Sequence, residues 1–362
     1  MDDVWKLDAY QKQFDAEILA MYMRQEGTES EIIDLLPNLY QETLRSLVDI
    51  LFSDFDKRSP AMLKEHRTLR RGFVKRNVAR WRRGFDLLER LIVISQESGA
   101  AVNGALRPKA AETGDALFEA VISNHARAVQ LSREILALMT AGFPNGAMGR
   151  WRTLHEIAVV SMFIYHAGRD TAERDILHDH VTSYKRAKNY MEHHKRANLG
   201  PIEPEVMERL RAAHDEVIRT RGDNMKHDYG WAAPALNNPR PTFADLELAT
   251  ELDHWRPRYK WATTNTRGAY QTLNSTLATC EADQPVLAVG ESNSGMTDPG
   301  HMTAISLNIA TMPVMMLEPN LDRLAAFLVM QRLSDEIGDT LLRLDRETYE
   351  RARKRRNAAA KR

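Results

Sequence analysis

The feature that most constrains the fold of this chain is the helical spacing of its apolar residues, which continues through nearly all of its 362 residues. Between Leu69 and Ile92, apolar side chains recur at helical steps, with arginines between them. This pattern predicts one long amphipathic helix from about residue 60 to about residue 97. No alternating run indicates a strand, and no repeat of fixed period is found. We therefore predict an all-α protein, a helical bundle with a long amphipathic basic helix in an N-terminal helical extension.

Helix caps and turn residues give the expected boundaries. Thr28 and Glu31 have the spacing of a capping box, and Ser59 followed by Pro60 is typical of a helix start. Residues 99–110 contain two glycines and a proline, so this segment is predicted to be a linker. The predicted domains are an N-terminal helical region at 1–105, a helical domain at 106–345 and a basic tail at 346–362.

After the linker, the apolar pattern predicts further helices separated by loops. The segments 142–146 and 228–241 are expected to be loops, and the polar segment 291–301 interrupts the pattern. The predicted helices lie at about 111–141, 146–167, 170–197, 242–252, 254–281 and 319–350, with another that opens at Pro204.

Charge is balanced overall, with 50 basic and 50 acidic residues, but it is not spread evenly. Residues 64–90 contain ten basic and three acidic residues, and the tail 346–362 contains eight basic and two acidic ones. These segments are either solvated helix faces that pair with acidic neighbours, or surfaces that bind RNA or another polyanion by releasing counterions from phosphates. In the second case, the candidate nucleic-acid-binding residues are Arg70, Arg71, Arg80 and Arg83.

Composition excludes several classes of protein. Cys280 is the only cysteine, which excludes a disulfide framework and a cysteine-built zinc site and is typical of a reducing cytosol. The longest apolar stretch, Ile157–Tyr165, is too short to span a bilayer. The first residues show neither the basic start nor the apolar run of a signal peptide. We therefore expect a cytoplasmic protein without a membrane partner.

A group of histidines is the strongest hint of a metal site. His178, His180, His193 and His194 fall on one predicted helix. Metal ligands on a helix share a face only when they are three or four residues apart, whereas these neighbours are one or two apart. We therefore predict no bound metal and expect solvated histidines. No glycine-rich phosphate loop follows a strand, so no cofactor is predicted.

An arginine and a histidine separated by four to six residues form the motif of HEPN ribonucleases. In such a site the imidazole moves the proton and the guanidinium stabilises charge on the phosphate, so no metal is needed. The spacing occurs five times here, about as often as chance predicts. Arg150–His155 and Arg221–His227 are the two pairs whose sequence surroundings distinguish them.

The first pair lies on the helix predicted at 146–167, which is apolar on most sides and is expected to be a buried central helix. Arg152 and Glu156 are four residues apart on it, with His155 on nearly the same face. Buried charges are costly unless they are fully bonded. The pair is therefore either a structural ion pair or part of a functional pocket, and both interpretations remain open.

Three short blocks resemble a known family. RTLHE at 152–156 is similar to the R-x-L-x-E signature of the family called domain of unknown function 5677. YGWA at 229–232 is similar to its tyrosine-glycine-tryptophan block, and YQTLNS at 270–275 to its Y-x-x-L-S helix. Where that helix usually carries a histidine, this chain has Ala278, Thr279 and Cys280. The resemblance covers about residues 115–335 and implies a bacterial helical protein without an established activity.

Two classes of function remain. One is an HEPN-like, metal-independent ribonuclease effector of the kind used in phage defence, and the other is a non-catalytic helical scaffold or small-ligand sensor. The candidate catalytic residues are Arg152, His155, Glu156, Arg221 and His227. The candidate ligand-binding residues are Arg150, Tyr229, Trp231 and Tyr270, whose aromatic members are expected to close over the charged group. A second copy of the chain, forming a homodimer, is a further candidate partner.

Overall fold

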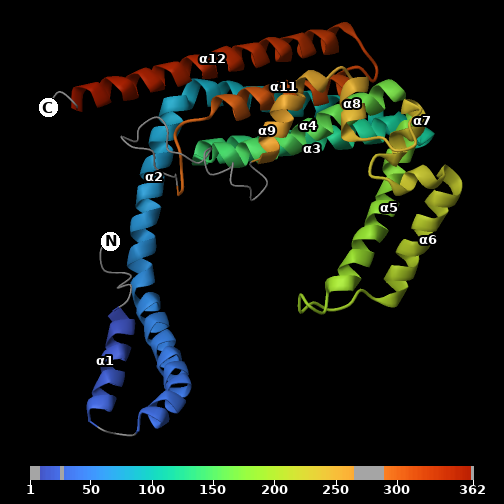
Figure 1. The fold of residues 1–362 in the computed structure, drawn as a ribbon. Helices are drawn as coiled ribbons and strands as arrows, with labels where there is room; N and C mark the ends of the chain where they lie inside the picture. Colours follow the sequence, from blue (N-terminus) through green and yellow to red (C-terminus); the bar gives the residue numbers. More distant parts are fainter. Residues whose placement is uncertain (1–8, 25–27, 265–288, 360–362) are drawn as a thin grey trace. The chain divides into compact units, whose positions relative to one another are not determined.

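The computed structural model describes residues 9–24, 28–264 and 289–359, and every regular element in these ranges is a helix (Figure 1). The prediction of an all-α protein is therefore confirmed. The chain divides into two compact units, residues 1–72 and 73–362. Among the described residues, no helix is both long enough and apolar enough to cross a membrane.

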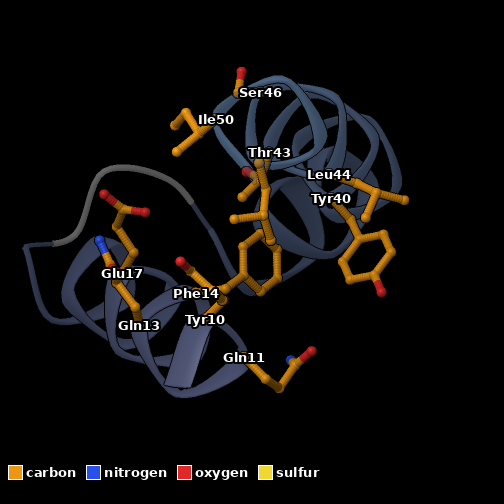
Figure 2. Close-up of a pocket in the computed structure, with 11 residues that line it drawn as sticks. Tyr10, Gln11, Gln13, Phe14, Glu17, Tyr40, Thr43, Leu44, Ser46 and Ile50 are labelled. Carbon is orange, nitrogen blue, oxygen red and sulfur yellow. The ribbon is translucent and has the colours of Figure 1, made fainter. Parts of the chain in front are cut away.

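The first unit is a pair of helices, α1 (Ala9–Met23) and the beginning of α2 (Glu29–Thr113). Phe14 of α1 packs edge-on against Tyr40 of α2, with ring centroids 5.5 Å apart. Beside this contact lies a hollow of about 240 Å³ lined by both helices (Figure 2). No side chain in the described part of this unit is fully buried, so the two helices share little core.

Helix α2 begins where the sequence predicts. The amide and the hydroxyl of Thr28 each donate to Glu31 Oε2 at 2.8 Å, which confirms the capping box. The second predicted start, at Ser59 and Pro60, is wrong because α2 continues through both residues. Ser59 Oγ donates to the carbonyl of Phe55 at 2.6 Å, so the hydroxyl bonds one turn back within α2 instead of capping a new helix.

The linker predicted at residues 99–110 is also wrong, because these residues are helical. Gly99 lies against the ring of His125, and a Cβ at this position would be 2.5 Å from His125 Nδ1. Val102 is 3% exposed, and Leu106 packs on the main core. Here glycine allows two helices to approach closely, and the burial of its apolar neighbours offsets its low helix propensity.

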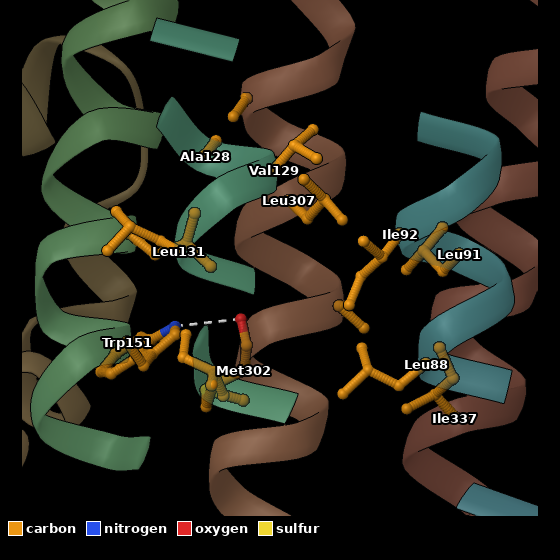
Figure 3. Close-up of a cluster of buried hydrophobic side chains, with 14 of the residues drawn as sticks. Leu88, Leu91, Ile92, Ala128, Val129, Leu131, Trp151, Met302, Leu307 and Ile337 are labelled. Atoms are coloured by element: carbon orange, nitrogen blue, oxygen red, sulfur yellow. Dashed lines mark hydrogen bonds between the residues drawn. The ribbon is translucent and has the colours of Figure 1, made fainter. Parts of the chain in front are cut away.

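The second unit is organised around its main core. Trp151 is 1% exposed, and its indole Nε1 donates to Met302 O at 3.0 Å and to Ser306 Oγ at 2.9 Å, which ties α4 to α11 (Figure 3). Leu88 of α2 and Ile337 of α12 belong to the same core. Most residues of this core come from the second part of α2, α3 (Ala116–Ala141), α4 (Pro144–Ala167), α11 (Thr297–Met315) and α12 (Leu321–Ala359).

Leu341 of α12 fits between glycines of two other helices. A Cβ at Gly84 of α2 would lie 2.5 Å from Leu341 Cδ2, and a Cβ at Gly300 of α11 would lie 2.5 Å from Leu341 Cδ1. The two methyl groups of this leucine therefore occupy the space that side chains at both glycines would need.

The remaining helices surround a second core that contains Val159, Phe163, Trp231 and Phe243. They are α5 (Arg169–His193), α6 (Pro204–Arg221), η1 (Asp223–Lys226), η2 (Gly230–Ala232), α7 (Ala233–Leu236), α8 (Phe243–Ala249), η3 (Asp253–Trp255) and α9 (Arg256–Thr264). The loop predicted at 228–241 is wrong in part, because η2 and α7 are helical. The helix predicted at 254–281 is present up to Thr264, and its remainder lies outside the described residues.

The sequence pattern does not predict α11. It treats residues 291–301 as an interruption and places no helix between residues 281 and 319. The helix is buried on nearly all sides, including polar residues such as Thr303, Ser306 and Thr311. A helix covered all round has no polar stripe, so the spacing of its apolar residues gives no amphipathic signal.

Candidate functional site

The candidate site is built on α4, the central helix. Helix α3 ends at Gly142, whose φ of 92° closes the helix and lets α4 begin at Pro144. From α4, Trp151 and Leu154 point into the main core. Arg152 and Glu156, by contrast, have side chains that are 32% and 27% exposed. They are therefore only partly buried, although the sequence analysis places them on a fully buried helix.

Arg152, Glu156 and Tyr259 of α9 form a closed polar group. Arg152 Nη2 lies 2.9 Å from Glu156 Oε1 and donates to the Tyr259 hydroxyl at 2.6 Å. That hydroxyl donates in turn to Glu156. The Arg152 guanidinium also lies over the Tyr259 ring, 4.8 Å from its centroid. Arg152 Nε is buried and has no partner among the described residues, so part of the binding capacity of this guanidinium is unused.

His155 belongs to a second polar group directly below the first. The imidazole is 1% exposed, and its Nε2 lies 3.3 Å from Glu247 Oε1. Glu247 of α8 is 0% exposed, and its other carboxylate oxygen accepts from Arg256 of α9. The buried carboxylate is thus held between an imidazole and a guanidinium. Because His155 is closed off from solvent, a direct role in proton transfer to a substrate would require α8 or α9 to move.

An aromatic shell surrounds both polar groups. Phe243 packs 6.1 Å from His155, 6.1 Å from Tyr229 and 5.0 Å from Tyr259, measured between ring centroids. Burial, and then the charge of Glu156, raises the pKa of Tyr229 to about 12. Burial, followed by the hydrogen bond to Glu156, also raises the pKa of Tyr259. Both phenols are therefore protonated donors at neutral pH.

Two of the three aromatic residues predicted to line the pocket are neighbours, because the ring centroids of Tyr229 and Trp231 are 6.5 Å apart. Tyr229 joins the shell around Arg152 and His155. Trp231 is 3% exposed and packs against Phe163 in the second core, with centroids 5.8 Å apart. Tyr270 lies outside the described residues.

The arginines of the two HEPN-like pairs are held by carboxylates of other helices. Arg150 pairs with Glu134 of α3, away from Arg152. Arg221 of α6 pairs with Asp170 at 3.1 Å and with Glu173 at 3.0 Å, both on α5. These ion pairs fasten α4 to α3 and α6 to α5. Within the described residues, no hydrogen bond joins either arginine to its histidine.

The histidines of α5 differ from the prediction in part. His178 is 6% exposed, and its Nε2 is 2.8 Å from the carbonyl oxygen of His227, so the expectation of a solvated side chain is wrong there. Burial is the main cause of its lowered pKa. His194 is also buried, whereas His180 and His193 are exposed. No group of three or more His, Cys, Asp or Glu side chains in the described ranges could hold a metal ion.

The structure places the predicted nucleic-acid-binding arginines of α2 in different surroundings. Arg83 pairs with Glu336 at 2.6 Å, Arg80 is partly buried, and Arg71 bonds to its own helix at Arg67 O and Thr68 Oγ1. Within the part of α2 that belongs to the second unit, the exposed basic side chains that form no ion pair with any described residue are Lys75, Arg76, Arg82 and Arg90. We call these four residues the cationic face. Lys75 and Arg82 are seven residues apart, and Arg76 and Arg90 are fourteen residues apart. Spacing by multiples of seven places residues on one side of a helix, and this is the signal that could have identified them.

A separate buried chain of hydrogen bonds joins α2, α3 and α11. Ser95 Oγ is 3.0 Å from His125 Nε2 and 2.9 Å from Thr311 Oγ1, and Thr311 donates to Leu307 O at 2.6 Å. Burial lowers the pKa of His125 to about 4. The imidazole is therefore neutral in the folded chain at neutral pH.

This histidine should make the chain less stable in acid. The pKa of His125 is below its ordinary value of 6.5, so the unfolded chain binds the proton first, and stability is lost as the pH falls from about 6.5 towards 4. Between about pH 7.5 and pH 5, the expected loss in free energy of unfolding is about 2 kcal/mol. Urea titrations at the two pH values measure it.

The variant His125→Gln supplies the control for this prediction, because it keeps a hydrogen-bonding side chain and removes the titration. The difference between the two proteins isolates His125 from Asp175, whose pKa is raised by burial to about 6 and whose effect has the opposite sign. Parallel pH curves for the two proteins would contradict the prediction.

Residues missed by the sequence analysis complete the candidate site. Glu247, Arg256, Tyr259 and Phe243 come from α8 and α9, which α4 meets only in the folded chain. A capping box at Thr242 fixes the start of α8, but no local pattern distinguishes Glu247 from an exposed helix residue.

Comparison with known proteins gives one result. Neither the curated proteins nor the solved structures yield a match to this chain. Residues 118–285 match the family of unknown function DUF5677. The matched segment contains α4, α8 and α9 and hence every residue of the two polar groups. The predicted resemblance to the DUF5677 family is thereby confirmed for residues 118–285 of this chain.

Proposed function

We propose that this chain binds RNA or another polyanion through the cationic face of α2. The observation that carries the proposal is the exposure of Lys75, Arg76, Arg82 and Arg90 without an ion pair to any described residue. They share one side of a helix over about 22 Å, since each residue adds 1.5 Å. Such a row can follow the phosphates of a nucleic acid and release their counterions.

The contrast with other basic residues supports this choice. Arg150, Arg152, Arg221 and Arg256 each lie against a carboxylate, so their charges stabilise contacts between helices and attract polyanions less. Among residues 75–90 of α2, only Asp86 and Glu89 are acidic, and Glu336 of α12 pairs with Arg83 beside the cationic face. Basic side chains outnumber these carboxylates, so the surface keeps a net positive charge.

Cleavage of the bound RNA, by an HEPN-like mechanism without a metal, is the more specific form of the proposal. Its support is that the DUF5677 segment contains all five motif-spaced pairs, among them Arg150–His155 and Arg221–His227. The half-buried His227 is a better proton carrier than His155, because His155 is 1% exposed. Catalysis by the second pair would require Arg221 to exchange Asp170 and Glu173 for a phosphate. A defence role in the cytoplasm depends on this activity.

The test is a charge reversal of the cationic face. Changing Lys75, Arg76, Arg82 and Arg90 together to Glu should abolish binding of a labelled single-stranded RNA, measured by fluorescence anisotropy. In the unmodified chain, affinity should fall with salt, and four phosphate contacts contribute a log–log slope of about −3. The same RNA, incubated in EDTA with the unmodified chain and with His227→Ala, shows whether it is cleaved.

A matched control is available on α5, the turn that follows it and α6. Lys188, Lys195, Arg196 and Arg209 are exposed, form no ion pair with a described residue, and give the same change in charge when replaced by Glu. This control should keep RNA binding. Equal binding by both variants would contradict the proposal and favour the scaffold or small-ligand sensor, in which Arg152 would face the ligand.

A further inference from the structure

The first unit has little core of its own. From Ala9 to Gly72, no described side chain is fully buried, and α1 extends along only the first part of this stretch of α2. A pair of helices that buries so little apolar surface gains little stability from folding alone. The unit therefore needs another surface to cover it.

The apolar surface that remains exposed is a stripe along one side of α2, of which Tyr40 and Leu44 also border the hollow beside α1. Its members are spaced by four or seven residues, or by fourteen across the middle, so they share one helix face. Their exposure ranges from 41% to 58%. We call this set the apolar face: Ile33, Tyr40, Leu44, Val48, Met62 and Leu69.

Four of the six members of the apolar face are placed symmetrically about Leu51, whereas Leu44 and Val48 have Arg58 and Asp54 at the mirrored positions. Ile33 and Leu69 each lie eighteen residues from Leu51, and Tyr40 and Met62 each lie eleven residues from it. If a second copy runs antiparallel with its two-fold axis at Leu51, Ile33 therefore faces Leu69, and Tyr40 faces Met62. Such an isologous pairing brings the same surface of both copies together.

The charges of the same segment favour that orientation. Residues 29–56 contain seven acidic side chains and one basic one, whereas residues 57–71 contain six basic and one acidic. In an antiparallel pair about Leu51, the basic stretch 57–71 of each copy lies along residues 31–45 of the other, which contain three acidic side chains and one basic one. A parallel pair would instead place like charges side by side, which disfavours it.

We infer that the first unit is a homodimerisation element, in which the apolar faces of two copies pack antiparallel across Leu51. The facing segment, 33 to 69, is about 54 Å long at 1.5 Å per residue, which is enough for five heptads of knobs-into-holes packing. The hollow of about 240 Å³ beside Leu44 offers space for a side chain of the second copy (Figure 2).

The first experiment measures the mass of the full chain by sedimentation equilibrium. The unmodified chain should have twice the 41.3 kDa of one copy. The double variant Leu44→Glu, Leu69→Glu should sediment as a monomer. The control Leu35→Glu, Leu63→Glu changes two leucines of similar exposure that lie off the apolar face, and it should remain a dimer. A monomeric unmodified chain, or a dimeric Leu44, Leu69 variant, overturns the inference.

A cross-linking experiment tests the orientation and does not depend on how the glutamate variants fold. In a Cys280→Ser background, chains with Ile33→Cys are mixed with chains with Leu69→Cys and treated with a short bis-maleimide. The antiparallel pair gives a cross-linked dimer only in the mixture. Cross-linking of Ile33→Cys chains alone indicates a parallel pair, and no cross-linking in any sample indicates no pairing along α2. Either result refutes the antiparallel dimer.

This interface uses residues 33–69 and leaves the cationic face at 75–90 unchanged. Loss of RNA binding and loss of the dimer are therefore separate results, so either proposal can fail without the other.

Discussion

Adding one methyl group at Gly230 is expected to destabilise the folded chain by about 3 kcal/mol or more, as overpacking does when the surroundings cannot adjust. In Gly230→Ala, the new Cβ would fall well inside the contact distance of the Asn224 carbonyl oxygen, 2.5 Å from its carbon and 3.1 Å from Met225 Cα. All three are backbone atoms, so no rotamer change can move them away. Helices η1 and η2 would have to separate.

Gly104→Ala is the control for this substitution. Gly104 is inside α2, and a Cβ there would have no atom within 4 Å. Alanine should therefore leave stability unchanged or raise it by up to about 1 kcal/mol, through its better helix propensity. Urea unfolding of both variants decides the matter, and equal midpoints would refute the close approach at Gly230. Because Tyr229 precedes this glycine, Gly230→Ala should also disturb the shell around Arg152.

Removing Arg256 should have an effect of similar size for an electrostatic reason. Glu247 is 0% exposed and is held between Arg256 and His155. In Arg256→Ala, the buried carboxylate loses its charged partner, and leaving a buried charge unpaired in this way costs about 3 kcal/mol. Chemical denaturation at neutral pH measures the loss.

Two further variants separate this explanation from a general effect of losing an arginine. Arg258→Ala removes a more exposed ion pair, to Asp298 at 3.1 Å, from the same helix and should cost less than about 1 kcal/mol. Adding Glu247→Gln to Arg256→Ala removes the stranded charge and should restore part of the stability. If Arg256→Ala and Arg258→Ala are equally stable, the buried pair does not contribute as described.

Helices with one apolar stripe are the part of the fold that the sequence predicts. Helix α4 begins and ends within two residues of its expected bounds, because turn residues flank it on both sides. Helix α11 is missed because it is buried all round. The linker predicted at residues 99–110 is wrong because it treats glycines as a sign of a break in the helix. Gly99 instead lies within α2, where its missing side chain leaves space for His125.

The candidate site divides in the same way between local and distant contacts. Arg152 and Glu156 are four residues apart, so helix geometry alone brings them together. His155 and Glu247 are 92 residues apart, and Glu156 and Tyr259 are 103 apart. Contacts of this kind depend on how α8 and α9 pack on α4, which residue spacing does not encode. The sequence identifies Tyr229 as a candidate only because it belongs to the family-like YGWA block. Its contacts with the aromatic shell could not be derived from the sequence.

The fit of Leu341 between Gly84 and Gly300 has a consequence for how this protein can change during evolution. Each methyl group of the leucine points at one glycine, so a rotation that made space for a new side chain at one would press the other methyl group against the opposite helix. Neither glycine can therefore accept alanine while the leucine remains. In related chains, a larger residue at either glycine should accompany a smaller one at position 341, so that three positions distant in sequence vary as one.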